Sequence, residues 1–148
     1  MNPFLLSNHE LLSEWKDFRK SLPSFSEAEQ LEKVALFWAQ APLMKFAYDA
    51  ERPDEWGTPW EQLDSNDWDR NSLAVGMEFT LRLSGWDASR LKLQYIRDPE
   101  ISNIVMVLKI DDIMLLNYYE RIISPLPNHD YGIIFSWQHD GKKYVERF

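Results

Sequence analysis

Cysteine is absent from this 148-residue sequence. Disulfide bonds, thiolate metal sites and thiol nucleophiles all require cysteine, so its absence excludes these three kinds of chemistry. The sequence also lacks an apolar stretch of transmembrane length, and its N-terminus lacks the basic residues that open a signal peptide. We therefore expect a protein without a membrane partner, located in the cytoplasm of a cell or of an infected host.

Basic residues are also few, and acidic residues outnumber them. Sixteen Lys and Arg face 24 Asp and Glu, which gives a net charge of −8. Proteins that bind nucleic acids neutralise phosphates with Lys and Arg, so we expect no nucleic-acid partner. The charge favours solubility and at most a basic protein partner. A DNA mimic is disfavoured because the acidic residues are dispersed along the chain.

Apolar side chains, in contrast, are plentiful. They make up 45% of the residues, and the chain has seven Trp. A disordered chain does not carry so much apolar and aromatic surface. The length suits one hydrophobic core, so we predict a single domain over residues 1–148, with residues 1–30 as a helical extension within it.

Helical spacing dominates the first half of the chain. Ser7 and Ser26 each precede a Glu by three residues, which predicts capped helices over 7–19 and from 26 to before Pro42. Thr58 and Pro59 predict the start of a short helix. A longer helix is expected from Asp67 or Asp69 to about Ser84, apolar on more than one side and therefore buried.

After Gly85 the spacing changes to that of β-strands. Alternation predicts a strand over 91–97, a β-branched run predicts another over 103–110, and a tight turn at 111–112 returns the chain over 113–117. A last hairpin is expected over 131–148. Helices followed by an antiparallel meander predict an α+β fold.

Many matches in order, over residues 31–138, resemble the bacterial transglutaminase-like cysteine proteinases, whose fold is papain-like. The matching residues are Tyr48, Trp56-x-Thr58-Pro59-x-Glu61-x-Leu63, Asp69, Phe79-Thr80-Leu81-Arg82, Gly85 and Arg90-Leu91-x-Leu93-x-Tyr95-Ile96-Arg97. The resemblance implies a central helix that begins at a catalytic cysteine and packs on the sheet.

The resemblance also implies three catalytic positions, and each holds another residue here. The cysteine position reads Arg70, the histidine position Asn103 and the aspartate position Asn117. Arginine is permanently cationic, and asparagine neither shuttles a proton nor carries the charge that orients an imidazole. We therefore predict a pseudoenzyme with Arg70 at a helix N-terminus, facing Asn103 and Asn117 on adjacent strands.

No nearby side chain replaces the missing nucleophile or base. Ser72 lies about 200° around the helix from Arg70 and therefore faces elsewhere. His9, His129 and His139 match no catalytic position, so we interpret these three histidines as exposed or capping residues. Family members that release adhesins bind calcium. Asp64, Asp67 and Asp69 are weak candidates for such a site, although helix capping explains them better. The expected cleft lining is Trp56, Trp60, Trp68, Asp69 and Ser72, with core packing as the other role for the Trp residues.

The function predicted from these residues is a catalytically inactive binding or assembly module with a protein partner and no cofactor. Short cysteine-free versions also resemble uncharacterised proteins of tailed phages. Two alternatives stay open: a hydrolase that uses Asp67 or Asp69 in the same cleft, and an acidic inhibitor of a host protein. The three substituted positions either form a hydrogen-bond network or still bind a ligand.

Overall fold

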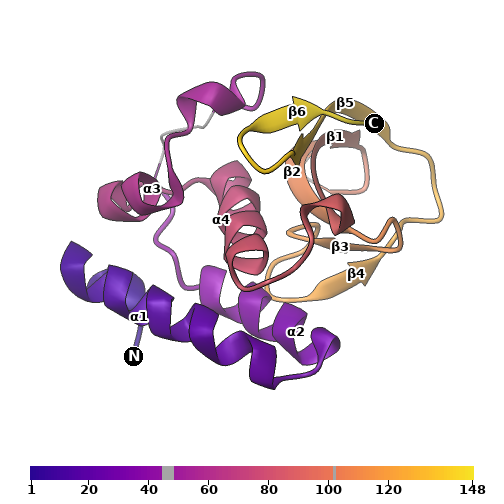
Figure 1. Cartoon of the computed structure of the whole chain (residues 1–148). Coiled ribbons are helices and arrows are strands. Elements are labelled where there is room, and N and C mark those ends of the chain that lie inside the picture. The colour runs from indigo at the N-terminus through magenta and orange to yellow at the C-terminus, as the bar shows by residue number, and fades with distance from the viewer. Residues whose placement is uncertain (45–48, 102) are drawn as a thin grey trace.

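The computed structural model describes residues 1–44, 49–101 and 103–148, with the side chain of Asn103 left out. Tyr48, part of the family pattern, lies outside the described residues. The helices are α1 (Asn8–Ser21), α2 (Glu27–Trp38), α3 (Pro59–Ser65) and α4 (Arg70–Leu83), with single turns at Pro3–Leu5, Leu22–Ser24, Pro53–Glu55 (η3) and Ala88–Arg90 (Figure 1).

Side-chain caps set where these helices begin, as the sequence predicted. Ser7 accepts a hydrogen bond from the backbone N–H of Glu10, and Ser26 accepts one from that of Glu29. Thr58 begins α3 with a complete capping box. These caps satisfy backbone donors that have no partner within the first helical turn.

A six-stranded antiparallel sheet forms the second half of the chain, in the order β4-β3-β2-β1-β5-β6. Its strands are β1 (Leu91–Asp98), β2 (Asn103–Ile110), β3 (Met114–Leu116), β4 (Ile123–Pro125), β5 (Gly132–His139) and β6 (Tyr144–Glu146).

The meander that we predicted is therefore wrong in its connectivity. β5 pairs with β1 rather than with its predecessor β4, which the sequence did not predict. Pro125 in β4 has no N–H to offer a further strand, which suits an edge position. The chain instead crosses the far face of the sheet, where Leu126 and Tyr131 pack against the cluster that contains Ile96 and Val105.

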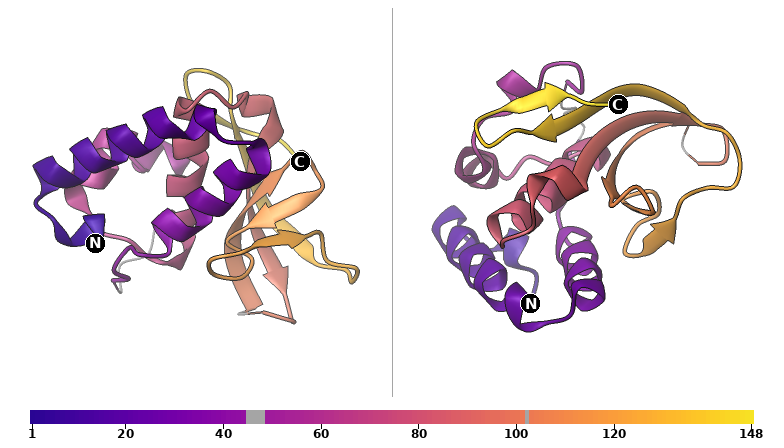
Figure 2. Two further views of the ribbon diagram at one scale, coloured as in Figure 1. Left: turned by 90° about the horizontal axis from the view of Figure 1, so that it is seen from below. Right: turned by 45° about the vertical axis from the view of Figure 1, so that its right-hand side comes forward.

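Helix α4 lies between the α1–α2 pair and the sheet (Figure 2). Every residue from 72 to 81 is buried, as expected for a helix covered on most sides. The indole N–H groups of Trp15 and Trp38 both donate to the Thr80 hydroxyl, at 3.0 and 3.1 Å. Gly76 allows the close approach, because a Cβ there would lie 2.6 Å from the ring of Trp38.

The first thirty residues contribute to the same core. Phe4, Leu11, Trp15 and Leu22 are buried in one cluster with the apolar side chains of α4. No helix in the described ranges is both long and apolar enough to cross a membrane.

Candidate functional site

The N-terminus of α4 is fixed by a capping box between Asp69 and Ser72. The Asp69 carboxylate accepts from the Ser72 backbone N–H at 2.7 Å, and the Ser72 hydroxyl accepts from the Asp69 backbone N–H at 2.9 Å. Ser72 is fully buried. Asp69 and Ser72, which we predicted to line the cleft, therefore fix the start of α4. They also orient Arg70, which lies between them in the sequence and faces the sheet.

Arg70 lies in the first helical position and reaches the loop that follows β3. Its Nε donates to Asn117 Oδ1 at 3.2 Å, and its Nη2 donates to the backbone carbonyls of Asn117 and Tyr118 at 3.1 and 3.3 Å. Its Nη1 pairs with Glu120 at 3.2 Å. Burial lowers the pKa of Arg70, and Glu120 opposes this shift. A guanidinium keeps its charge at neutral pH in any case.

Asn117 completes the network from the sheet side. Its Nδ2 donates to the carbonyls of Arg70 and Met106 at 2.7 and 2.9 Å. Its φ of 66° lies in the left-handed region, which asparagine tolerates better than most residues. The bonds between Arg70 and Asn117 therefore run in both directions and tie α4 to the end of β3.

Asn71 and Glu120 are residues of this site that the sequence did not single out. Asn71 Oδ1 accepts from the backbone N–H of Met106 at 2.9 Å, which joins α4 directly to β2. Asn71 lies in the first turn of a helix and Glu120 in a loop, where polar residues are common, so nothing in the sequence distinguished these two from ordinary surface residues.

Asn103 occupies a different place from the other two substituted positions. It is the first residue of β2 and pairs with Asp98 of β1. Three positions separate it from Met106, the β2 residue that meets Asn71 and Asn117, which is about 10 Å along a strand. The structure brings Arg70 and Asn117 together and places the backbone of Asn103 further along β2.

The three Trp residues expected around the cleft have separate environments. Trp68 is fully buried against Trp38, with ring centroids 4.8 Å apart. Trp56 is nearly buried and donates from Nε1 to the carbonyl of Asp49 at 2.9 Å. Trp60 is half exposed and lies edge-on to Trp15. Trp68 is thus a core residue, and none of the three contacts Arg70 through a ring interaction in the described part of the chain.

The interpretation of His129 as an exposed or capping residue is wrong. Its Nε2 lies 2.8 and 2.9 Å from the two carboxylate oxygens of Asp98, which is completely buried. Tyr118 donates its hydroxyl to the same carboxylate at 2.8 Å. The partners are far apart in sequence and meet only because the β4–β5 connection crosses the sheet. His9 is exposed, and His139 accepts from the N–H of Gly141 in the last hairpin.

A small cavity of about 80 Å³ lies beside the network. Its lining comes from α2, the segment after it, α4 and the β3–β4 loop: Ala35, Ala39, Ala41, Leu43, Leu73, Met77, Asn117, Glu120 and Arg121. A cavity of this size accommodates a few solvent-sized atoms rather than a peptide, because ligand pockets usually measure several hundred Å³.

Comparisons with known proteins identify the fold. No family model and no curated protein matches the chain. Among solved structures, Legionella pneumophila LapG matches with a TM-score of 0.71 and 23% identity, over 87% of this chain and 73% of that one. Its calcium-bound form matches with a TM-score of 0.70 and 22% identity, over 90% and 76%, and its EGTA-treated form gives the values of the first.

LapG is a bacterial transglutaminase-like cysteine protease, so the predicted papain-like α+β fold is confirmed at the level of the fold. One prediction is overturned. We predicted that the protein is not an enzyme, but its fold is similar to that of LapG, a cysteine protease, which contradicts this prediction. The sequence still has no cysteine, so thiol chemistry is excluded.

Calcium is present in one of these LapG structures, so its fit to this chain matters. In the described ranges, no group of three or more His, Asp or Glu side chains is arranged to hold a metal ion. Asp69 caps α4, and the cationic Arg70 follows it. Calcium requires six to eight oxygen ligands, so Asp67 and Asp69 alone do not fit it. The described residues thus adopt the papain-like fold of LapG, and the sequence has no cysteine to supply a thiol.

Proposed function

We propose that this protein is a binding or assembly module that engages a protein partner beside the Arg70–Asn117 network. The observation that carries this proposal is a group of exposed apolar side chains around Arg121. We call it the Arg121 surface and define it by Leu36, Leu43, Tyr119, Arg121 and Ile122.

The apolar members of this surface are unusually exposed. Leu36, Leu43 and Ile122 expose 50–52% of their area, and Tyr119 exposes 46%. Arg121 lines both the small cavity that contains Leu43 and a shallow groove of about 560 Å³ that contains Leu36 and Phe18. Tyr119 and Ile122 are near neighbours of Arg121 in the sequence. Exposed apolar side chains that gather beside a groove mark interaction sites.

The network at Arg70 supports the proposal because it positions this surface. Arg70 binds the carbonyls of Asn117 and Tyr118 and the side chain of Glu120, which immediately precede Arg121. The position that the sequence resemblance assigns to the nucleophile therefore holds a residue that fixes a loop here. An ordered loop loses less entropy when it binds a partner.

Charges on the same surface favour one class of partner. Lys33 and Arg121 line the groove between α1 and α2, together with Phe18, Phe25 and Phe37. Apolar residues bordered by two cations match a polypeptide that presents apolar side chains next to acidic ones. Capture of a basic protein whose activity falls on binding would point to the inhibitor alternative instead.

A capture experiment with matched variants tests the proposal. The double variant L43E/I122E places charge in the Arg121 surface, and I113E places it on another exposed isoleucine, in the β2–β3 turn. We expect wild type and I113E to capture the same polypeptide from a lysate of the source organism, and L43E/I122E to lose it. Equal capture by all three proteins would contradict the proposal.

Hydrolysis is a second candidate, favoured by the contact between His129 and Asp98. A buried carboxylate that orients an imidazole is the arrangement that general-base catalysis uses. Asp69, the base considered from the sequence, is engaged in capping α4. Turnover of a peptide or ester that H129Q abolishes while the protein stays folded would support this candidate. Turnover that H129Q leaves unchanged would exclude it.

A further inference from the structure

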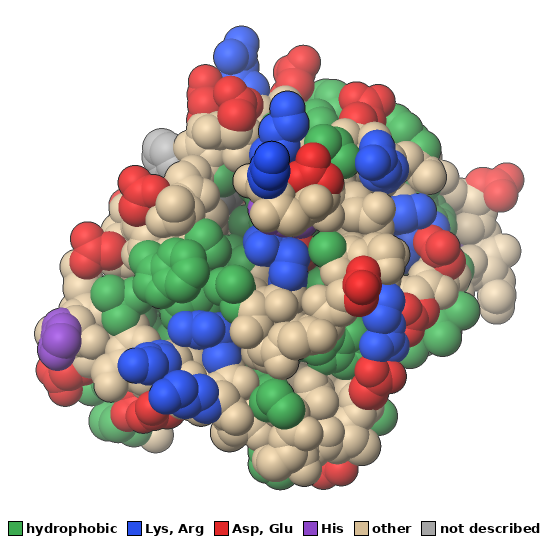
Figure 3. Space-filling model, in the orientation of Figure 1, with side chains coloured by type: hydrophobic (Ala, Val, Ile, Leu, Met, Phe, Trp, Pro, Cys, Tyr) green, Lys and Arg blue, Asp and Glu red, His purple; other side chains and the backbone are tan. Residues whose placement is uncertain are grey.

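A groove of about 700 Å³ lies along the C-terminal half of α4, away from the Arg70 network. One wall comes from η3 and α3, and the other from the β5–β6 hairpin. In Figure 3 the surface is hollowed between α3 and the tip of this hairpin, with Lys and Arg side chains on the hairpin side. The volume suits a ligand of several residues.

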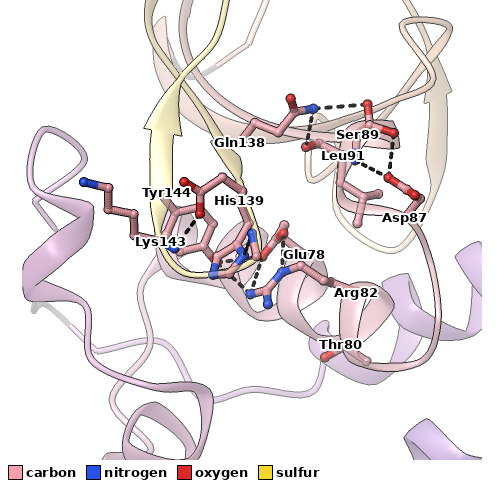
Figure 4. Close-up of polar contacts among 12 residues, drawn as sticks. Glu78, Thr80, Arg82, Asp87, Ser89, Leu91, Gln138, His139, Lys143 and Tyr144 are labelled. Atoms are coloured by element: carbon pink, nitrogen blue, oxygen red, sulfur yellow. Dashed lines mark hydrogen bonds and ion pairs between the residues drawn. The ribbon is translucent and has the colours of Figure 1, made fainter.

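Arg82 and Tyr144 line the groove, and both bond to the buried Glu78, which does not line it itself. Glu78 exposes 1% of its surface and accepts from the Tyr144 hydroxyl at 2.6 Å. Arg82 donates to Glu78 through Nε at 2.9 Å and through Nη2 at 3.3 Å. Figure 4 shows Glu78 and Arg82 projecting from α4 towards Tyr144 on the hairpin.

The environment shifts the pKa values of Tyr144, Arg82 and the nearby His139. Burial and then Glu78 raise the pKa of Tyr144, so its hydroxyl stays protonated. Burial alone would lower the pKa of Arg82, but Glu78 and Tyr144 outweigh it and raise the pKa. Burial and then Arg82 lower the pKa of His139, which favours its neutral form.

Two polar atoms at the groove lack a partner within the described residues. Gln62 Nε2 donates to the carbonyl of Gly57, but the buried Gln62 Oε1 accepts no hydrogen bond. Arg82 uses Nε and Nη2, and its Nη1 makes no hydrogen bond to the described part of the chain. Gln62 Oε1 is a buried acceptor, and Arg82 Nη1 is a donor on a residue that lines the groove, so a ligand that offers both a donor and an acceptor complements the two. A peptide group offers both.

Strand β6 supplies further main-chain groups because it is the outermost strand of the sheet. Lys143 O accepts from the Asp140 N–H, and the Arg147 N–H donates to Ser136 O, so these residues face β5. Alternation along a strand turns the main-chain groups of Tyr144 and Glu146 away from β5. An extended polypeptide can pair with such an edge.

Charges of opposite sign stand on the two walls. Lys142 and Lys143 line the hairpin side, and Glu51 and Asp54 line the opposite side. Within the described residues, none of these four side chains forms an ion pair. Trp137 and Tyr144 supply apolar surface between the walls.

We infer that this groove binds an extended polypeptide segment of a partner protein, in which an apolar residue stands between a basic and an acidic one. The acidic residue faces Lys142 and Lys143, the basic residue faces Glu51 and Asp54, and the apolar residue packs on Trp137. The inference is independent of the Arg121 surface, because the two sites share no residue.

A nuclear magnetic resonance titration with three short peptides tests this inference. Each has a central leucine: the first carries lysines before it and aspartates after it, the second reverses this order, and the third has serines throughout. We expect one charged order to bind about tenfold more tightly than the serine peptide. The shifted resonances should be the Trp137 indole and the amides of Tyr144 and Glu146.

Charge reversal of the walls sharpens the test. In the quadruple variant E51K/D54K/K142E/K143E we expect the preference between the two charged peptides to invert. These four side chains are exposed, so the variant should unfold at nearly the same urea concentration as wild type. I113E serves as the control and should bind as wild type does. An unchanged preference, shifts outside the groove, or no binding of any peptide would each overturn the inference.

Discussion

The two halves of helix α4 differ in how the polar side chains around them are paired. At the N-terminus, Arg70 and Asn117 direct their hydrogen bonds at each other and at nearby carbonyls, beside a cavity of only about 80 Å³. Beside the C-terminal half, Nη1 of Arg82 and Oε1 of Gln62 in the neighbouring α3 have no hydrogen-bond partner in the described residues, next to a groove of about 700 Å³. We call the N-terminal end the closed end, because its donors and acceptors are paired within the protein and so stabilise the fold. The unpaired atoms at the other end remain available to bind a ligand.

The strongest test of the closed end is Asn117→Ala. The change removes two donated hydrogen bonds and forces alanine into a left-handed backbone conformation, so we expect the free energy of unfolding to fall by about 3 kcal/mol. Urea denaturation measures it. Asn117→Gly is the matched control, because it loses the same hydrogen bonds without backbone strain and should fall by about 2 kcal/mol. Equal, small losses would mean that the network is not formed.

Glu78→Gln tests the polar cluster that holds Arg82 and Tyr144 at the groove. The substitution leaves Arg82, which is 17% exposed, without its counter-charge, and we expect a loss of about 2 kcal/mol. The double variant E78Q/R82Q removes both charges and should be more stable than E78Q alone. If E78Q/R82Q is the less stable protein, the cluster does not act as an ion pair.

Arg70→Lys should have a smaller effect on the closed end. Lysine keeps the charge but cannot reach Asn117 and two backbone carbonyls with one planar group, so we expect a loss of about 1 kcal/mol. The variant should also weaken partner capture through the Arg121 surface while peptide binding in the groove is unchanged. Loss of both activities would show that the two halves of α4 are coupled.

Lowering the pH is expected to have the smallest effect, and it acts on a third region, around Asp98. Burial would raise the pKa of Asp98, but hydrogen bonds from Glu100, His129 and Tyr118 outweigh it and lower the pKa. The unfolded state, with a pKa of about 3.9, then binds the proton more readily, so stability present above that pH is lost as the pH falls through the folded pKa. This dependence should be weaker in D98N and unchanged in Arg70→Lys.

The sequence predicted the helices and most strands because their signals are local. Ser7, Ser26 and Thr58 act on backbone groups within one turn, so three-residue spacings suffice to find them. The position of β5 beside β1 could not be predicted in this way. It depends on how the 126–131 connection packs on the far face of the sheet, and three-residue strands such as β4 carry little pattern.

The residues of the candidate sites likewise differ in whether they could be predicted from the sequence. The family resemblance placed Arg70 and Asn117 on facing elements, and the structure joins them by hydrogen bonds. Glu78 looks like an ordinary polar position of a helix, and it is buried only because the last hairpin brings Tyr144 over it. Asp98 and His129 meet across 31 residues, and no local pattern indicates such a contact.

Site-specific photo-crosslinking at position 122 tests the proposed function most directly. A photoreactive residue replaces Ile122 in the Arg121 surface or, as the control, Ile113 in the β2–β3 turn, and each protein is irradiated in a lysate of the source organism. We expect a discrete adduct from position 122 that unlabelled wild type competes away and L43E/I122E does not. No adduct at position 122, or the same adduct at position 113, would contradict a binding module that works through this surface.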